Sequence, residues 1–184
     1  MRIIGGDFKG RKLRSVPGSN IRPTADRTRE AIFNILASRV RGSNVLDLFA
    51  GTGAFGIEAL SRGADSAFFI DCYKEPISVL RRNLEDISLE SRSKILQWNI
   101  AKSLDCLRSL QTSFNLIFLD PPYNKNLIIP TLSNLHNSRS VRKGACVVIE
   151  HSQHESISFD ESIFKQSDQR KYGKTLVSFF NYML

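Results

Sequence analysis

Four consecutive residues, Asp120-Pro121-Pro122-Tyr123, follow an apolar run from Phe114 to Leu119. An exocyclic base nitrogen is a weak nucleophile because its lone pair is delocalised into the ring, so the amine must be held firmly if it is to react. The Asp120 carboxylate and the Pro121 carbonyl can accept its hydrogens, since the two prolines fix φ and stiffen the turn. Tyr123 offers a flat face for an extruded base. The motif predicts group transfer to a base amine, with orientation contributing much of the rate.

The same four residues could also do no more than end a buried strand, so the segments around them decide. A glycine-rich turn precedes them, in which Gly51, Gly53 and Gly56 have the spacing of a nucleotide-binding turn. Asp71 lies twenty residues after Gly51 and can accept hydrogen bonds from ribose hydroxyls. This spacing alone fits NAD-type dinucleotides and S-adenosylmethionine about equally well.

The negative charge of Asp47 distinguishes between these two candidate ligands. Its carboxylate stands four residues before Gly51, where it would repel the phosphates of a dinucleotide. The same carboxylate attracts the ammonium and sulfonium groups of S-adenosylmethionine, which has no phosphate. We therefore expect a methyl donor here, held by the turn, by the acid that ends the next strand and by the tetrapeptide. These candidates are Asp47, Ala50, Gly51, Thr52, Gly53, Gly56, Asp71 and Asp120.

The net charge of +8 is concentrated near the N-terminus. Residues 1–41 hold ten basic and three acidic side chains and carry +7, whereas residues 42–184 carry only +1. Such a segment is expected to bind a polyanion such as RNA or DNA, although a basic surface can also serve solubility alone. The candidate RNA contacts are Arg2, Lys9, Arg11, Lys12, Arg14, Arg22, Thr24, Arg27 and, for stacking, Tyr172.

Residue periodicity predicts the elements that position these groups. Residues 1–41 are interpreted as a basic appendage, with a hairpin over 2–14, a loop at 16–20 and a helix over 24–40. Residues 42–184 alternate apolar runs with helical patterns, which predicts a parallel α/β sheet covered on both faces. The expected strands are 44–49, 66–70, 94–97, 114–119, 145–149, 157–166 and 175–183, the last two as an antiparallel hairpin. One expected helix follows the glycine turn and ends at residue 62, and three others cover 75–87, 101–110 and 128–137.

Composition excludes several other classes of protein. No apolar run approaches the roughly 18 residues that span a bilayer, and none of leader length precedes the first charges. Cys72, Cys106 and Cys146 are odd in number and scattered, which predicts neither disulfides nor a zinc knuckle and fits the cytoplasm. His151 and His154 have a metal-ligand spacing but no acidic or cysteine partner nearby in sequence. We expect no metal and no membrane partner.

Taken together, these motifs resemble the RsmD type of 16S rRNA (guanine-N2) methyltransferase. The resemblance runs nearly end to end. The Asp-Pro-Pro-Tyr motif is shared with DNA adenine and other amino methyltransferases, whereas an Arg-Pro-Thr-x-Asp-Arg stretch at 22–27 narrows the choice. The matching segments are 1–6, 10–13, 21–34, the glycine turn, 58–64, 120–123 and 150–151.

The resemblance implies a Rossmann-like class I fold with a seven-stranded sheet, S-adenosylmethionine as cofactor, and a guanine N2 of 16S rRNA as target. The rRNA would be presented in the 30S subunit or an assembly intermediate, with no obligate protein partner. Catalytic roles fall to Asp120, Pro121 and Tyr123, and adenine contacts to Asn99 and Ile100. Relatives usually carry an acid at the position of Asn99, whose amide can donate as well as accept.

Three alternatives remain open at this point. The same chemistry could act on DNA adenine N6, although the chain has no separate segment for target recognition. An NAD-dependent oxidoreductase is disfavoured by Asp47 and by the two prolines. The chain could also be a non-catalytic rRNA-binding assembly factor that retains the fold. Whether Asp120 removes a proton or only positions the amine is likewise open.

Overall fold

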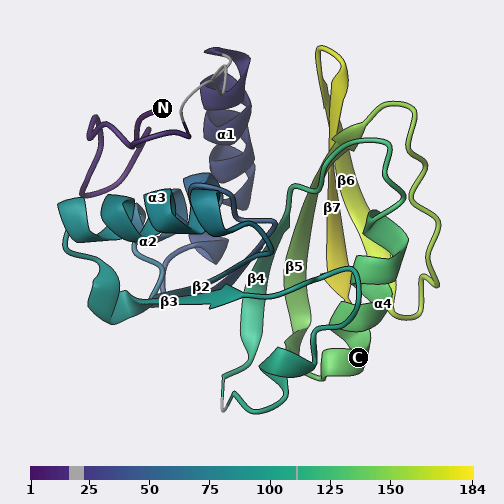
Figure 1. The fold of residues 1–184 in the computed structure, drawn as a ribbon. Coiled ribbons are helices and arrows are strands. Elements are labelled where there is room, and N and C mark those ends of the chain that lie inside the picture. Colours follow the sequence, from purple (N-terminus) through teal and green to yellow (C-terminus); the bar gives the residue numbers. More distant parts are fainter. Residues whose placement is uncertain (17–22, 111) are drawn as a thin grey trace.

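The computed structural model describes residues 1–16, 23–110 and 112–184, and of residues 23–25 it describes the backbone alone. Its centre is a seven-stranded sheet in the order β3-β2-β1-β4-β5-β7-β6 (Figure 1). Strands β1 to β5 pair in parallel, whereas β7 is antiparallel to β5 and β6. The predicted fold class is confirmed. The strands are β1 Asn44–Leu48, β2 Ser66–Asp71, β3 Ser93–Gln97, β4 Phe114–Leu119, β5 Val141–Ser152, β6 Phe164–Tyr172 and β7 Thr175–Tyr182.

Helices cover both faces of this sheet. Alternating strand residues make two separate apolar clusters, because successive side chains point to opposite faces. Val45, Phe69 and Phe118 pack with α1, α2 and α3, whereas the neighbouring residues Leu46 and Ile70 pack with η3 and α4. The helices are α1 Pro23–Leu36, α2 Ala54–Ser61, α3 Lys74–Asp86 and α4 Ile128–Ser138, with 3-10 turns η1 Ala37–Arg39, η2 Glu90–Arg92 and η3 Asp105–Leu107.

The strand order reverses beside β1. From β1 the chain goes outward through β2 to β3 and then returns to place β4 on the other side of β1. Open α/β sheets bind ligands at such a switch point, outside the carboxyl ends of the strands. The glycine turn follows β1 and the Asp-Pro-Pro-Tyr motif follows β4, so the two motifs meet at this carboxyl edge.

The N-terminal segment follows the path of the predicted hairpin but forms no regular strand. Arg2 and Lys12 make a single antiparallel bridge, and the Leu13 amide donates to the Met1 carbonyl at 2.9 Å. Ile3 and Leu13 are buried in the same cluster as α1 and the sheet. The basic segment is therefore anchored in the core. The predicted loop at 16–20 lies mostly outside the described residues.

The helix predicted at 101–110 is wrong, since only Asp105–Leu107 form a helical turn there. Residues 98–113 connect β3 to β4, and β2 and β1 lie between those strands. The carbonyls of Ile100 and Ser103 accept from the side chains of Asn134 and Trp98, at 3.0 and 2.9 Å, and these contacts hold the crossover in an irregular path. Leu104 and Leu107 are buried as the helical pattern suggested, but from an irregular crossover.

The first strand of the C-terminal hairpin is also misplaced in the prediction. The sequence predicts it at 157–166, but β6 is Phe164–Tyr172. The apolar residues Ile157, Phe159 and Ile163 pack from a loop against the core, whereas β6 itself is an edge strand with mostly polar, exposed side chains. An edge strand of this kind lacks the apolar pattern that sequence analysis detects. The partner strand β7 and the hairpin pairing are confirmed.

No helix among the described residues is both long and apolar enough to cross a membrane.

Candidate active site

The glycine turn is held by the two acids that end β1 and β2. Asp47 is fully buried, and its Oδ2 accepts the Gly56 amide at 2.8 Å. Asp71 accepts the Gly51 amide on Oδ2 at 2.8 Å and the Tyr73 amide on Oδ1 at 2.9 Å. Both acids therefore shape the turn directly, a role that the sequence analysis did not assign to them.

The three glycines of the turn have different surroundings. A Cβ on Gly56 would collide with the Phe69 ring, so this glycine allows α2 to approach the sheet. Gly51 has φ +54°, and a Cβ on it would meet nothing within 4 Å. Its backbone lines an open cavity, which is where a ligand can approach the main chain. Gly53, with φ 88°, directly precedes α2. Of the other residues in the turn, Ala50 is buried, and the Thr52 carbonyl accepts from Asn83 Nδ2 at 3.0 Å.

The cavity beside Gly51 has a volume of about 400 Å³ and joins the two predicted motifs. It lies at the carboxyl ends of β1, β2 and β4 and contains acidic, aromatic and proline side chains. The structure thus brings together the candidates Gly51, Asp71, Asp120, Pro121 and Tyr123. The full lining is Phe49, Gly51, Asp71, Cys72, Tyr73, Pro76, Asp120, Pro121, Pro122 and Tyr123.

Tyr123 is anchored at its hydroxyl group. The hydroxyl donates to Glu150 Oε1 at 2.8 Å and lies 3.2 Å from Thr175 Oγ1. Glu150 belongs to β5 and Thr175 begins β7, so the antiparallel end of the sheet holds the tip of the ring. Burial raises the pKa of the Tyr123 hydroxyl, which keeps it a hydrogen-bond donor at neutral pH. The ring itself borders the cavity.

Several carboxylates meet at low solvent exposure around this cavity. Burial raises the pKa of Asp120 well above its usual range, and the charges of Glu150 and Asp47 raise it further. Burial also raises the pKa of Glu150. For Asp47, burial raises the pKa to about 8, against the lowering effect of the Gly56 amide. A cationic ligand would relieve this repulsion, and the lining contains no basic side chain that would attract a phosphate.

Comparisons with known proteins agree with this geometry. A family model described as Conserved hypothetical protein 95 matches residues 1–181. Ribosomal RNA small subunit methyltransferase D of Escherichia coli is 35% identical over 150 residues, which are 82% of this chain and 74% of the relative. The "Putative rRNA methyltransferase YlbH" of Bacillus subtilis is 32% identical over 180 residues, 98% of each chain.

This chain belongs to the RsmD family. A solved structure from Escherichia coli, "Putative methyltransferase yhhF", superposes with a TM-score of 0.85 at 31% identity and covers 100% of this chain and 98% of its own. The resemblance that the sequence motifs suggested is confirmed.

Of the predicted RNA contacts, the structure brings three together. Arg2, Lys9 and Arg27 line a second cavity of about 380 Å³, along with the acids Asp26 and Glu30. This cavity lies between the N-terminal segment and α1. The cavity therefore contains charges of both signs. Across residues 1–41 the basic side chains are in the majority.

The other predicted RNA contacts have different surroundings. Arg11 and Lys12 are exposed. Arg14 makes a bidentate ion pair with Asp86 of α3, at 2.7 Å for Nε. Tyr172 is partly buried against the core beside the β6–β7 turn. Arg22 and the side chain of Thr24 lie outside the described residues.

The two candidates for the cofactor's adenine lie at the end of β3. Asn99 is exposed, and its carbonyl accepts the Lys102 amide at 3.1 Å. Ile100 is buried in the core cluster on the α4 face. Neither residue lines the 400 Å³ cavity. Both residues follow β3, whose last residue, Gln97, pairs with Asp71 of β2.

Sequence analysis missed several residues around the site. Glu150 anchors Tyr123, and Phe49, Cys72 and Tyr73 line the cavity. A signal for the last three was present, since each lies within two residues of Asp47 or Asp71, at the carboxyl end of a strand. Glu150 was noted only as part of the matching segment 150–151 and without a role, because its contact with Tyr123 depends on how β5 pairs with β4.

His151 and His154 do not act together. His151 is buried, with Nε2 2.9 Å from Ser178 Oγ and Nδ1 3.0 Å from the Ser152 carbonyl oxygen. Burial lowers the pKa of His151, so the ring is neutral and serves as a core hydrogen-bonding group. His154 is exposed on the following turn.

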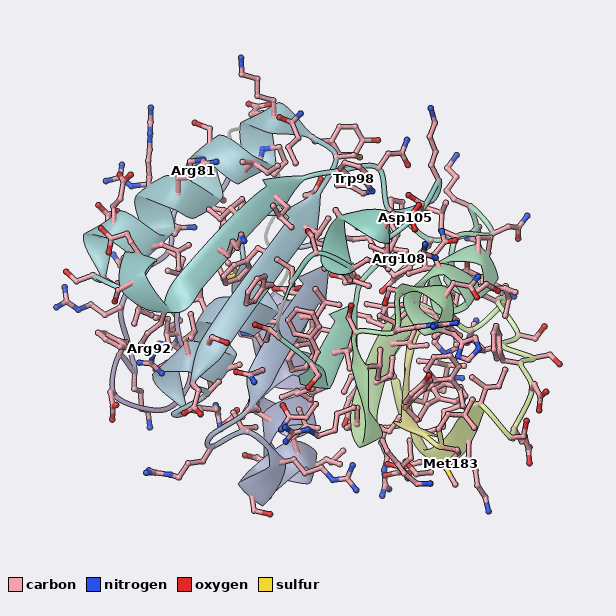
Figure 2. All side chains as sticks on the ribbon, turned by 90° about the horizontal axis from the view of Figure 1, so that it is seen from below. Arg81, Arg92, Trp98, Asp105, Arg108 and Met183 are labelled. Atoms are coloured by element: carbon pink, nitrogen blue, oxygen red, sulfur yellow. The ribbon has the colours of Figure 1, made fainter. Side chains whose placement is uncertain are left out.

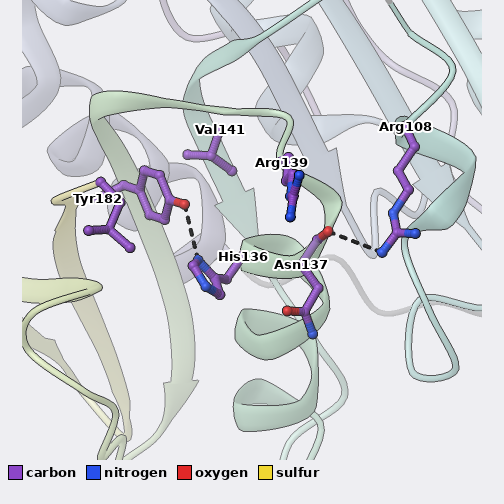
Figure 3. A pocket seen from close by; sticks show the side chains of 7 residues that line it. Arg108, His136, Asn137, Arg139, Val141 and Tyr182 are labelled. Carbon is purple, nitrogen blue, oxygen red and sulfur yellow. Dashed lines mark hydrogen bonds between the residues drawn. The ribbon is translucent and has the colours of Figure 1, made fainter.

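A larger cavity of about 760 Å³ lies at the opposite edge of the sheet (Figure 3). It forms where α4 ends and β5 begins, and two of its contacts are His136 Nδ1 to the Tyr182 hydroxyl, 3.1 Å, and Arg108 Nη2 to the Asn137 carbonyl, 3.3 Å. No acidic side chain lines this cavity, and none of the predicted site residues reaches it. Size alone therefore does not identify the reactive site.

Proposed function

We propose that this chain transfers a methyl group from S-adenosylmethionine to the exocyclic N2 of a guanine in 16S rRNA. The observation that carries the proposal is the position of Asp120. Its carboxylate lines one cavity with the backbone of Gly51 and with Asp71, so a group held by the glycine turn and an amine held by Asp120 would be adjacent.

The cavity fits S-adenosylmethionine better than a dinucleotide. Asp71 would attract the ammonium and sulfonium groups, and these cations would favour the ionised forms of Asp47, Asp120 and Glu150, whose pKa values burial raises in the ligand-free protein. Gly51 allows close approach of the main chain, and Asp71 lies where it can accept from ribose hydroxyls through its remaining lone pairs. Asn99 and Ile100 are proposed to lie beside the adenine. When bound, the cofactor supplies an electrophilic methyl group.

The residues of the Asp-Pro-Pro-Tyr turn orient the amine. Asp120 and the Pro121 carbonyl accept its hydrogens, which directs the nitrogen lone pair toward the methyl group. Tyr123 stacks on the base, and Glu150 and Thr175 fix the ring through its hydroxyl. Holding two reactants in line in this way can contribute several kcal/mol to catalysis.

The choice of substrate rests on the relatives and on the basic segment. Curated relatives that share 35% identity with this chain are named ribosomal RNA small subunit methyltransferase D, and guanine N2 follows from the RsmD resemblance. Phosphates of the rRNA, within a small-subunit particle, would contact the basic residues near the N-terminus. The proposed contacts are Arg2, Lys9, Arg11, Lys12, Arg14, Arg22, Thr24, Arg27 and Tyr172.

Methyl transfer to defined substrates tests this proposal. Labelled S-adenosylmethionine is incubated with the protein and with 30S particles, naked 16S rRNA or DNA, and the nucleosides are then separated and identified. We expect N2-methylguanosine from an rRNA-containing substrate. Label in N6-methyladenine of DNA would replace the substrate assignment, and no transfer to any substrate would favour a non-catalytic assembly factor.

The variant Asp120→Ala tests the proposed catalytic role of Asp120. Calorimetry should show S-adenosylmethionine binding retained, while methyl transfer falls by at least a hundredfold, because removing a positioning group costs rate rather than cofactor affinity. An Asp120→Ala variant with unchanged turnover would remove Asp120 from the mechanism. Preferential binding of NAD by the unaltered protein would overturn the cofactor assignment.

A further inference from the structure

Exposed aromatic side chains gather on one edge of the molecule. Among the described residues, the exposed aromatic residues are Tyr73 at 64%, Trp98 at 40% and Tyr123 at 36%. Tyr73, Trp98 and Tyr123 lie in the segments that follow the carboxyl ends of the parallel strands β2, β3 and β4 respectively. Tyr123 has a role in the proposed reaction. Trp98 has none so far.

Trp98 is exposed and yet fixed. Its indole Nε1 donates to the Ser103 carbonyl at 2.9 Å, and its backbone amide donates to the Asp71 carbonyl at 2.9 Å. Figure 2 shows Trp98 near the ends of the strands. An indole that belongs to neither apolar cluster exposes a large apolar surface to water, which a bound partner would remove.

The neighbours of Trp98 connect it to the catalytic cavity. The sheet order β3-β2-β1-β4 places Trp98 first, Tyr73 next and Tyr123 last along the carboxyl edge. β3 and β4 are three strand spacings apart, roughly 14 Å. Tyr73 lines the cavity itself. The exposed residues Lys74 and Lys102 lie near Tyr73 and Trp98 in the sequence.

We propose that Trp98, together with Tyr73, is a stacking platform for unpaired nucleotides of the RNA next to the target base. Aromatic rings beside basic side chains are the usual means of holding single-stranded RNA, because every base has a face that can stack. A fixed ring loses little conformational freedom on binding. This inference rests on the proposed function, since it places the flanking strand relative to the base that Asp120 holds.

Fluorescence tests the platform directly, because Trp98 is the chain's single tryptophan. The full-length protein is titrated with a single-stranded RNA oligonucleotide of mixed sequence, with the same strand in a duplex, and with S-adenosylmethionine alone. We expect quenching by the single strand, much weaker quenching by the duplex, and little change with the cofactor. Quenching by S-adenosylmethionine and not by RNA would assign the ring to the adenine pocket instead. Quenching by neither would also overturn the platform.

Substitution gives a second, independent readout. Trp98→Ala should weaken binding of the single strand roughly tenfold, equivalent to about 1.4 kcal/mol, and raise the KM for rRNA while kcat stays unchanged. Trp98→Phe keeps a ring and should retain most of the affinity. Met183→Ala removes an apolar side chain that is 39% exposed on a different part of the surface and should change nothing.

The two proposals fail in distinguishable ways. If Trp98→Ala binds RNA and turns over as the unaltered protein does, the platform is refuted and the methyl-transfer proposal stands. If the unaltered protein transfers no methyl group to rRNA yet single-stranded RNA quenches Trp98, the platform stands as an RNA-binding surface and the proposed reaction fails.

Discussion

Tyr123 is oriented by Glu150 and Thr175, and this arrangement can be tested by single substitutions. Tyr123→Phe keeps the ring but removes the hydrogen bond to Glu150. We expect kcat/KM to fall about tenfold, because the stacking face becomes less well oriented. Glu150→Ala should give a similar reduction, whereas Glu150→Gln retains an acceptor oxygen and should have a smaller effect.

A double-mutant cycle shows whether Glu150 acts through Tyr123. If it does, the Tyr123→Phe/Glu150→Ala double variant should be little worse than either single variant, since both substitutions break the same hydrogen bond. Reductions that multiply would mean that Glu150 has a separate effect, for example through its charge on Asp120. Thermal unfolding of each variant serves as the control for folding.

Asp47 gives the ligand-free protein a distinct pH dependence. Its pKa is about 8 in the folded protein, against an ordinary value of 3.8, so folding takes up a proton between these pH values. The free energy of unfolding should therefore fall as pH rises from about 4 to about 8, by at most about 1.4 kcal/mol per pH unit from this group. Urea unfolding at a series of pH values measures the slope.

Asp47→Asn separates this effect from those of other groups. The asparagine keeps an oxygen for the Gly56 amide but cannot ionise, so the slope should become shallower. Asp65→Asn changes an exposed carboxylate and should leave the slope as it is. An equally steep slope in Asp47→Asn would mean that Asp47 is ionised in the folded protein.

At the residue scale, sequence patterns grouped residues that the structure places around one cavity. Asp120, Pro121 and Tyr123 are adjacent in sequence, and Gly51 and Asp71 follow a spacing that the βαβ unit imposes. Glu150 could not be found in this way, because its contact with Tyr123 joins two segments that are distant in the sequence. The additional role of Asp47 and Asp71, which accept amides of the glycine turn, also depends on folded geometry.

At the scale of elements, the N-terminal segment is fastened to α2 by the buried side chains of Glu58 and Ser61. Glu58 accepts the amides of Ile4 and Gly5, each at 2.8 Å, and pairs with Arg62 at 2.7 Å and Arg29 at 3.6 Å. Arg29 is itself buried and donates to the Arg2 carbonyl at 2.6 Å. The segment that carries the basic residues is thus connected to the helix that follows the glycine turn.

Glu58→Gln should destabilise the protein substantially. It removes the negative charge that balances two arginines in a buried position, and breaking a buried ion pair from one side costs about 3 kcal/mol or more. Asp86→Asn, which breaks the exposed pair with Arg14, should have no measurable effect. Denaturant unfolding of both variants makes the comparison. Equal stability of the two would mean that the Glu58 network contributes nothing.

Helices and strands were predicted correctly where apolar residues recur with a regular spacing. They were missed where contacts between distant segments determine the local structure. β1, β2, β4 and β7 were placed to within a residue or two. The edge strand β6 has no such period, and the crossover before β4 has an apolar pattern without a helix. The N-terminal hairpin was predicted from its glycines, but its anchoring through Ile3 and Leu13 was not.

At the scale of the whole molecule, acidic and basic side chains gather in different places, and each group suits a different ligand. The cavity of the carboxyl edge is acidic, whereas residues 1–41 carry +7. A cationic cofactor and a polyanionic RNA would therefore each be drawn to a different part of the molecule. Deleting the basic segment would not test this separation, because Ile3, Leu13 and α1 belong to the core.

Substituting exposed basic residues tests this separation of charge without disrupting the fold. The triple variant Arg2→Gln, Lys9→Gln and Arg27→Gln removes the basic side chains of the 380 Å³ cavity. Removing one cation that pairs with a phosphate should reduce the slope of log affinity against log salt concentration by about 0.7 for single-stranded RNA, so the slope should become shallower by roughly 2. Affinity for rRNA at low salt should fall, while calorimetric affinity for S-adenosylmethionine stays the same.

A matched variant controls for net charge alone. Arg139, Arg142 and Lys143 are exposed near the start of β5, at the opposite edge of the sheet. Changing these three to Gln lowers the net charge by the same amount, so a purely long-range attraction would weaken RNA binding equally in both variants. Specific binding at the N-terminal segment would leave the second variant close to the unaltered protein. Equal weakening in the two variants would therefore reject the N-terminal segment as the RNA-binding surface.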